Sequence, residues 1–220
     1  MKKSTEKQDK KQVFNLIIAD ESGSMCIIRK QAFSGLNETI TTVQAMQKKY
    51  EETDQRVSLL TFDDSHMKWH YDNRSAYRVK PLRWEAYSPG GGTPLYDAIG
   101  TAISKVNAQI SPDAKVLVTI ITDGEENSSQ EWTLKMVRNL IEKLKKNGWT
   151  FTLIGTDNLD VESMANAFAI DEHMEFHQDE KGTKAMFERE RRSRVRYNAC
   201  IVEETEIPTG SFFDDDEQKN

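Results

Sequence analysis

The sequence predicts an α/β fold built on a doubly wound, mostly parallel sheet with helices on both faces. Apolar runs of strand length recur along the chain, and their nearly unbroken character is typical of strands that are buried on both sides. Segments with apolar residues at helical spacing separate these runs. Strands that alternate with helices favour parallel pairing with right-handed crossovers, so the two observations together predict the fold class.

Six segments are expected to form strands. The clearest are four runs rich in apolar and β-branched residues, at 13–19, 56–62, 115–122 and 149–156. Shorter strands are expected at 66–73 and, at an edge, at 174–178. The apolar periodicity predicts helices at 27–50, 93–109, 128–148 and about 183–198.

Residues near the ends of the expected helices support these assignments. Thr93 is suited to an N-cap, and Pro94 then takes the first helical position. Ser128 and Glu131 have the spacing of a capping box, and Gly148 is a suitable helix terminator.

One globular domain is expected at residues 12–200, because 220 residues of which 37% are hydrophobic can bury one sizeable core. Residues 1–11 read as a polar leader, and residues 201–220 are expected to form a flexible acidic tail. Phe212 and Phe213 precede three aspartates in this tail. They suggest, as a hypothesis, a short linear docking segment.

The composition disfavours several classes of partner. A net charge of −6 argues against a general binder of nucleic acids or anionic membranes. Cys26 and Cys200 are too few for a disulfide framework and are expected to be reduced thiols. No apolar signal region follows the basic N-terminus, and no segment reaches the roughly 18 apolar residues of a membrane span, so a cytoplasmic location is expected.

Arginines are concentrated in the last expected helix. Glutamates are interspersed among them and aromatic residues are not interleaved, which favours a solvated helix face over a phosphate-binding patch. The arginines concerned are Arg189, Arg191, Arg192, Arg194 and Arg196.

Three segments rich in oxygen donors follow or precede the expected elements: "DESGSM" at 20–25, "PGGGTPL" at 89–95 and "IITDGEEN" at 120–127. A doubly wound sheet brings such segments together beyond the carboxyl ends of its strands. Side chains two residues apart point to the same side, so the first segment can aim three oxygens at one point. The expected ligands are Asp20, Ser22, Ser24, Thr93 and Asp123. Hard oxygen donors favour Mg²⁺ or Mn²⁺ over zinc or copper, with Ca²⁺ as a further choice.

A simpler interpretation is that these residues only shape the backbone. Asp20 and Ser24 could cap the following helix, and Asp123 could occupy a turn after its strand. Capping explains one of the three segments but not all of them, so the metal site is the favoured interpretation.

The three motifs, in this order and on these element types, resemble the metal ion-dependent adhesion site of von Willebrand factor type A domains, whose pattern is D-x-S-x-S, then T, then D. The resemblance covers roughly residues 11–198. The chain is most similar to bacterial stand-alone domains of this family rather than to integrin inserted domains. The resemblance implies a three-layer, Rossmann-like sheet with one antiparallel edge strand.

The resemblance also implies roles for the five residues. Ser22, Ser24 and Thr93 would be hydroxyl ligands, and Asp20 and Asp123 would bind the cation directly or through water. A glutamate or aspartate from a partner protein would fill the remaining coordination position. Members of the family often scaffold multiprotein machines, including partners of AAA+ ATPases and stress- or defence-associated systems.

Several acids lie near the expected site. Glu21, Glu125 and Glu126 could tune the cation or contact a partner, but solvated rim acids are favoured. Asp97 could orient a ligand water, or equally complement the dipole of its own helix. Asp157 ends another parallel strand and is therefore expected on the same rim, where it could touch a partner.

The alternative function is a metal-dependent hydrolase or phosphatase. Asp20 at a strand end resembles the nucleophile of haloacid dehalogenase-type phosphatases, but that family has a second aspartate where this chain has Ser22. His173 and His177 have a zinc-like spacing, yet no third ligand accompanies them and surface histidines are favoured. A protein-interaction module that is not an enzyme is therefore the expected function.

Overall fold

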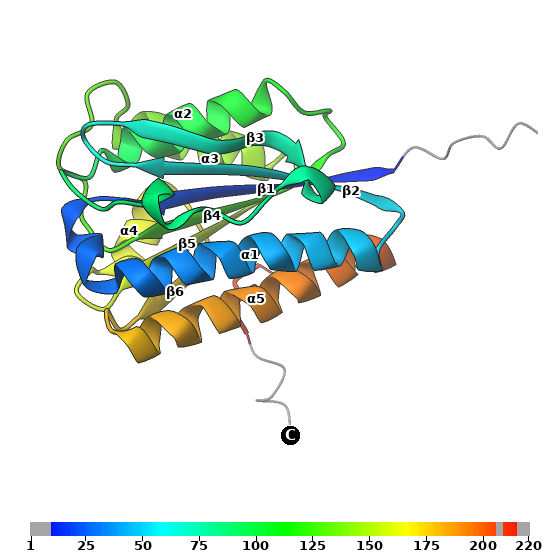
Figure 1. The fold of residues 1–220 in the computed structure, drawn as a ribbon. Helices are drawn as coiled ribbons and strands as arrows, with labels where there is room; N and C mark the ends of the chain where they lie inside the picture. The colour runs from blue at the N-terminus through cyan, green and yellow to red at the C-terminus, as the bar shows by residue number, and fades with distance from the viewer. Residues whose placement is uncertain (1–9, 206–208, 215–220) are drawn as a thin grey trace, which may run out of the picture.

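The computed structural model describes residues 10–205 and 209–214. Its centre is a six-stranded sheet in the order β3-β2-β1-β4-β5-β6 (Figure 1). β3 pairs antiparallel with β2, and every other neighbouring pair is parallel. The strands are β1 (Lys11–Asp20), β2 (Thr53–Phe62), β3 (Met67–Ser75), β4 (Lys115–Thr122), β5 (Trp149–Thr156) and β6 (Glu172–Phe176). The predicted fold class is confirmed, including the antiparallel edge strand.

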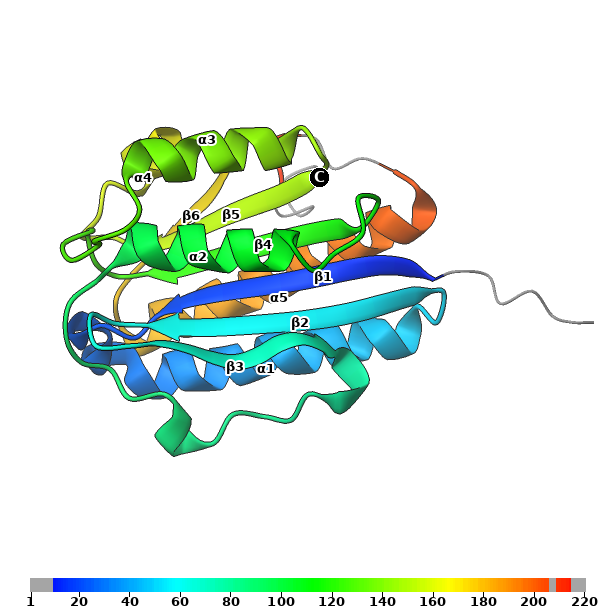
Figure 2. The same cartoon turned by 90° about the horizontal axis from the view of Figure 1, so that it is seen from above.

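Helices cover both faces of this sheet, so the molecule has three layers (Figures 1 and 2). One face carries α1 (Arg29–Lys49) and α5 (Glu180–Glu203), which pack against each other. The other face carries α2 (Leu95–Asn107), α3 (Leu134–Lys145) and α4 (Val161–Phe168). None of the helices in the described part of the chain is long and apolar enough to cross a membrane.

The central strand β1 contributes to both layers of the core. Phe14, Leu16 and Ile18 belong to the apolar cluster on the α2 and α3 side, whereas Ile17 and Ala19 belong to the cluster on the α1 and α5 side. Side chains alternate along a strand, so a strand covered on both faces needs apolar residues at every position. This requirement explains the nearly unbroken apolar run in the sequence, which the buried Asn15 interrupts.

Three helices differ from the sequence prediction. α2 begins at Leu95 with Pro94 at its N-cap position, so the predicted N-cap Thr93 and the first helical position for Pro94 are wrong by one residue. α4 is absent from the prediction because it has only eight residues, although Asp160 caps it by accepting a hydrogen bond of 2.9 Å from the Ser163 N–H. α3 begins at Leu134, and Thr133 is its cap, so the predicted capping box of Ser128 and Glu131 is wrong.

A buried polar network lies between α5 and the sheet. The Arg194 side chain is fully buried and donates to Asn15 Oδ1 at 2.6 Å, to Thr119 Oγ1 at 2.9 Å and to Glu190 Oε1 at 2.5–2.8 Å. The prediction of a solvated arginine face is therefore wrong for Arg194. Its charge is neutralised inside the fold by Glu190, one helical turn earlier.

Residues 209–214 pack onto the domain. Phe212 and Phe213 are 1% and 4% exposed, and the Arg196 guanidinium donates to the Phe212 carbonyl at 2.6 Å. The Glu172 carboxylate of β6 accepts hydrogen bonds from the backbone N–H groups of Gly210 and Phe212 at 2.6 and 2.8 Å. For these residues the predictions of a flexible tail and of a free docking segment are wrong, because the two rings are part of the core. Residues 1–9 of the leader, and 206–208 and 215–220 of the tail, lie outside the described part.

Candidate functional site

The five expected ligands lie at the carboxyl ends of β1 and β4 and at the start of α2. Asp20 is the last residue of β1, Asp123 directly follows β4, and Thr93 stands two residues before α2. β2 lies on one side of β1 and β4 on the other, so the strand order reverses between β1 and β4. This reversal is where doubly wound sheets bind ligands.

Asp20 is fully buried and its carboxylate is held at both oxygens. Oδ1 accepts a hydrogen bond of 2.7 Å from the Ser22 N–H, and Oδ2 accepts one of 2.7 Å from Thr122 Oγ1. Burial raises the pKa of Asp20, although these hydrogen bonds oppose the effect. The carboxylate is therefore fixed in place in a poorly solvated position.

Ser22, Ser24 and Asp123 form a continuous set of oxygens. The two serine hydroxyls are 3.2 Å apart, and Ser24 Oγ donates to Asp123 Oδ1 at 2.7 Å. Asp123 is 3% exposed, and burial, with a smaller contribution from the charge of Asp20, raises its pKa to about 6. Both acids of the set are thus short of neutralising partners.

Thr93 joins this set through a close approach at Gly124. A Cβ atom on Gly124 would lie 2.9 Å from Thr93 Oγ1, which is too close, and 3.7 Å from Ser24 Oγ, which is ordinary contact. Glycine therefore leaves room for the Thr93 hydroxyl beside Ser24. The Thr93 backbone N–H is fixed by Asn127 Oδ1 at 2.8 Å. The structure therefore brings together the oxygens of all three predicted segments.

This donor set suits a hard divalent cation. It consists of two carboxylates and three hydroxyls, and in the described residues no lysine, arginine or histidine forms an ion pair with Asp20 or Asp123. A buried carboxylate pair without a counter-charge is costly, and a cation between the two would remove that cost. The described residues contain no group of three or more His, Cys, Asp or Glu side chains that could hold a metal.

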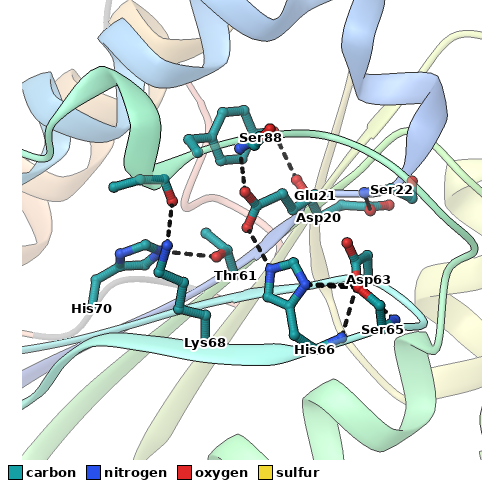
Figure 3. A network of polar contacts seen from close by, with 12 residues as sticks. Asp20, Glu21, Ser22, Thr61, Asp63, Ser65, His66, Lys68, His70 and Ser88 are labelled. Atoms are coloured by element: carbon teal, nitrogen blue, oxygen red, sulfur yellow. Dashed lines mark hydrogen bonds and ion pairs between the residues drawn. The ribbon is translucent and has the colours of Figure 1, made fainter.

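Glu21 is buried rather than solvated. Figure 3 shows its carboxylate between Ser88 and His66. Its Oε1 accepts a hydrogen bond from the Ser88 N–H, and its Oε2 lies 3.4 Å from His66 Nε2 without a hydrogen bond. The Gly90 N–H donates to the Glu21 carbonyl at 2.9 Å. The prediction of a rim acid is wrong for Glu21, which instead connects the first ligand segment to the loop that carries Thr93.

Asp97 holds a neighbouring loop. Its carboxylate accepts backbone hydrogen bonds of 2.6–2.9 Å from three successive residues, Gln130, Glu131 and Trp132. This role was not among those predicted, and it explains why residues 130–132 do not extend α3: their N–H groups are bound to Asp97.

Of the other two predicted rim acids, one is structural and one is exposed. The Glu126 carboxylate accepts from the backbone N–H groups of Tyr96, Ser128 and Ser129 at 2.7–2.9 Å, so the prediction of a solvated acid is wrong for Glu126. Glu125 is exposed beside Gly124 and stays a candidate for contact with a partner.

The ends of β5 and β6 also reach the site. The Asp157 carboxylate lies 2.6 Å from Nδ1 of the exposed His177. This hydrogen bond, together with the negative charge of Asp157, raises the pKa of His177. Gln178, which sequence reasoning missed, donates its side-chain amide to Asp123 Oδ2. The only sequence signal for Gln178 was its position at the end of an expected strand, on the same rim as the ligands.

Comparisons with known proteins agree with this geometry. The family model described as von Willebrand factor type A domain matches residues 16–189. No curated protein sequence matches the chain significantly.

Among solved structures, the pilus adhesin SpaC from Lactobacillus rhamnosus GG, in its open conformation, has a TM-score of 0.64 at 15% identity. The match covers 86% of this chain and 31% of SpaC, so the chain spans about a third of that protein. The vWF domain of the type V pili tip protein Mfa5 from Porphyromonas gingivalis has a TM-score of 0.63 at 12% identity and covers 90% of this chain and 98% of that domain. The SpRpn10 VWA domain has a TM-score of 0.54 at 13% identity, with 80% and 93% covered.

These identities show a shared fold, and the family model gives the assignment. It matches residues 16–189, which is most of the chain, and this range contains all five expected ligands. The chain therefore belongs to the von Willebrand factor type A domain family.

Proposed function

We propose that this protein is a divalent-cation-dependent protein-interaction module that acts as an adaptor or scaffold. The cation is Mg²⁺, with Mn²⁺ or Ca²⁺ as alternatives, held by Asp20, Ser22, Ser24, Thr93 and Asp123. The observation that carries the proposal is the convergence of three hydroxyl groups on two buried carboxylates that have no cationic partner among the described residues.

A cation at this site supplies a positive charge that can bind a carboxylate from another protein. The five residues would hold the cation through their oxygens, and because Mg²⁺ takes six ligands, one position would be left for a further ligand. A glutamate or aspartate side chain of the partner fills this position in the proposal. The charge pair forms at a preorganised point, and the exposed rim around it, with Glu125 among its residues, supplies specificity.

The partner is proposed to be a component of a multiprotein machine, an AAA+ ATPase system or a stress- or defence-associated complex in the cytoplasm. Its recognition group is an acidic side chain rather than a nucleic acid or a membrane. The solved structures similar to this chain include adhesin and pilus proteins and the SpRpn10 VWA domain, which supports an interaction role in general.

Cation binding is tested by thermal unfolding with Mg²⁺ or Mn²⁺ against EDTA. A ligand at 100 times its Kd stabilises the folded state by about 2.7 kcal/mol, so wild-type protein is expected to show a clear rise in Tm. Asp20→Ala should abolish the rise. Asp113→Ala is a matched control, because Asp113 is exposed at the opposite end of the sheet. An unchanged wild-type Tm at millimolar Mg²⁺ and Mn²⁺ would refute the proposal.

Partner binding is tested by affinity capture from a lysate of the source organism. A bound protein that EDTA releases, and that Asp123→Ala fails to capture, is the expected result. Release of phosphate from generic phosphoesters with Mg²⁺, lost in Asp20→Ala, would instead favour the hydrolase.

A further inference from the structure

The side chain of Gln178 connects the candidate cation site to the loop between β6 and α5. Its Nε2 donates to Asp123 Oδ2 and lies 3.4 Å from the Ser24 carbonyl oxygen. The other carboxylate oxygen, Asp123 Oδ1, accepts from Ser24 Oγ at 2.7 Å. The Asp123 carboxylate is therefore held from two sides, by a hydroxyl of the first ligand segment and by an amide from the opposite end of the domain sequence.

Gln178 is itself held in this orientation. Asn158 Nδ2 donates to Gln178 Oε1 at 3.2 Å, so the amide oxygen is occupied and the NH₂ group faces Asp123. The Gln178 backbone N–H donates to Asp157 Oδ1 at 3.3 Å, and the other oxygen of Asp157 pairs with His177. Residues from the loops that follow β5 and β6 thus hold the Gln178 amide in place against the Asp123 carboxylate.

We propose that Gln178 is a positioning residue of the cation site, which fixes the Asp123 carboxylate and thereby sets the affinity for the cation. The loop between β6 and α5 then becomes a fourth segment of the site, in addition to the three that carry its ligands. This inference rests on the proposed function, since it concerns the same cation.

The chemistry of an amide suits this role. A carboxylate beside a cation must be oriented without being neutralised, because a lysine or arginine on it would repel the cation and compete for the carboxylate. A glutamine donates a hydrogen bond and brings no net charge. Hydrogen-bond partners of metal ligands typically change the metal affinity by 10- to 100-fold when they are removed.

The test is the Kd for Mn²⁺, measured by titration calorimetry on the full chain. Gln178→Ala is expected to weaken Mn²⁺ binding by about tenfold or more, with unchanged far-UV and near-UV circular dichroism in EDTA. Gln109→Ala is the matched control, because Gln109 is an exposed glutamine two residues after the C-terminal end of α2 and should leave the Kd unchanged. A Gln178→Ala Kd within twofold of wild type overturns the inference.

Asn158→Ala separates positioning from a general structural effect. Asn158 is expected to act through Gln178, so its replacement should weaken Mn²⁺ binding less than Gln178→Ala does and should have no further effect in the Gln178→Ala background. An equal loss in both backgrounds contradicts the inference. Failure of wild-type protein to bind either Mg²⁺ or Mn²⁺ refutes the proposed function itself, whereas normal wild-type Mn²⁺ binding with an unaffected Gln178→Ala variant refutes only the role of Gln178.

Discussion

Ser24 and Asp123 are 99 positions apart in the sequence, and the Ser24 hydroxyl donates a hydrogen bond of 2.7 Å to Asp123 Oδ1. The contact exists because β1 and β4 are neighbours in the sheet and end at the same edge, with Ala19 paired to Ile121. The candidate site is thus a product of strand pairing rather than of any single loop.

The stability of the cation-free protein should fall as pH rises toward neutrality. The pKa of Asp123 is about 6 in the folded state and near 3.8 when unfolded, so the folded state holds an additional proton between these values. The stability that this proton contributes, at most about 3 kcal/mol, is present below about pH 4 and lost as pH rises through 6. Urea unfolding in EDTA across this range measures it.

The Asp123→Asn variant is the control for this pH dependence. The stability of Asp123→Asn should fall less with rising pH than that of wild type. In wild type, the Mn²⁺ affinity should increase over the same pH range, because protons compete with the cation for the carboxylate. Identical pH profiles for the two proteins would contradict the assignment to Asp123.

Cation binding should require the hydroxyl group of Thr93 but not its methyl group. Thr93→Val keeps the volume and removes the oxygen, so it is expected to weaken Mg²⁺ and Mn²⁺ binding strongly. Thr93→Ser keeps the oxygen and should bind within a fewfold of wild type. Titration calorimetry compares the two, and equal binding by both variants would exclude Thr93 as a ligand.

Replacing Asp97 should destabilise the fold. Asp97→Ala leaves three backbone N–H groups of the loop before α3 without their acceptor, which should cost about 2–4 kcal/mol of unfolding free energy. Chemical denaturation checks the value, and the exposed Asp113 gives a control, since Asp113→Ala should change stability by less than about 0.5 kcal/mol. A loss as small as that of the control would show that Asp97 does not anchor the loop.

The buried pair of Arg194 and Glu190 should behave non-additively. Arg194→Met alone leaves an uncompensated buried carboxylate and should cost about 3–5 kcal/mol. Removing both charges in Arg194→Met with Glu190→Leu should recover much of this loss, because neither charge then stays buried without a partner. Additive losses in a double-mutant cycle would contradict the structure.

Phe212 should contribute to the stability of the domain. Its ring is 1% exposed and packs against Phe213 and Tyr197, so Phe212→Ala should lower the unfolding free energy by about 3–5 kcal/mol. Phe212→Leu fills more of the space and should lose less. If Phe212→Ala unfolds at the wild-type denaturant concentration, the ring is not part of the core in solution.

Sequence patterns predicted the sheet well because its central strands are buried on both faces and their apolar runs are nearly unbroken. They also selected the five oxygens that the structure brings together, since parallel strands end at a common edge. α4 was missed because eight residues give little periodicity.

The roles of the surrounding residues were not readable from the sequence. Glu21, Asp97 and Arg194 are polar residue types that are usually exposed, and only contacts between distant segments bury them. Phe212 gave a signal, since it is an apolar residue in an acidic tail, but the sequence did not show that its binding surface belongs to the same chain. Gln178 gave no signal beyond its place at a strand end.

The direction of β1 decides how the molecule should be attached for binding measurements. Lys11 and Asp20 are its first and last residues, and ten residues of strand span about 30 Å. A sensor surface coupled at the Lys11 end of this strand would hold the candidate site at the opposite end of the sheet, open to solution. Attachment near residue 214 would instead pull on the segment in which Phe212 is buried. A change in binding could then come from a disturbed fold as well as from the interaction.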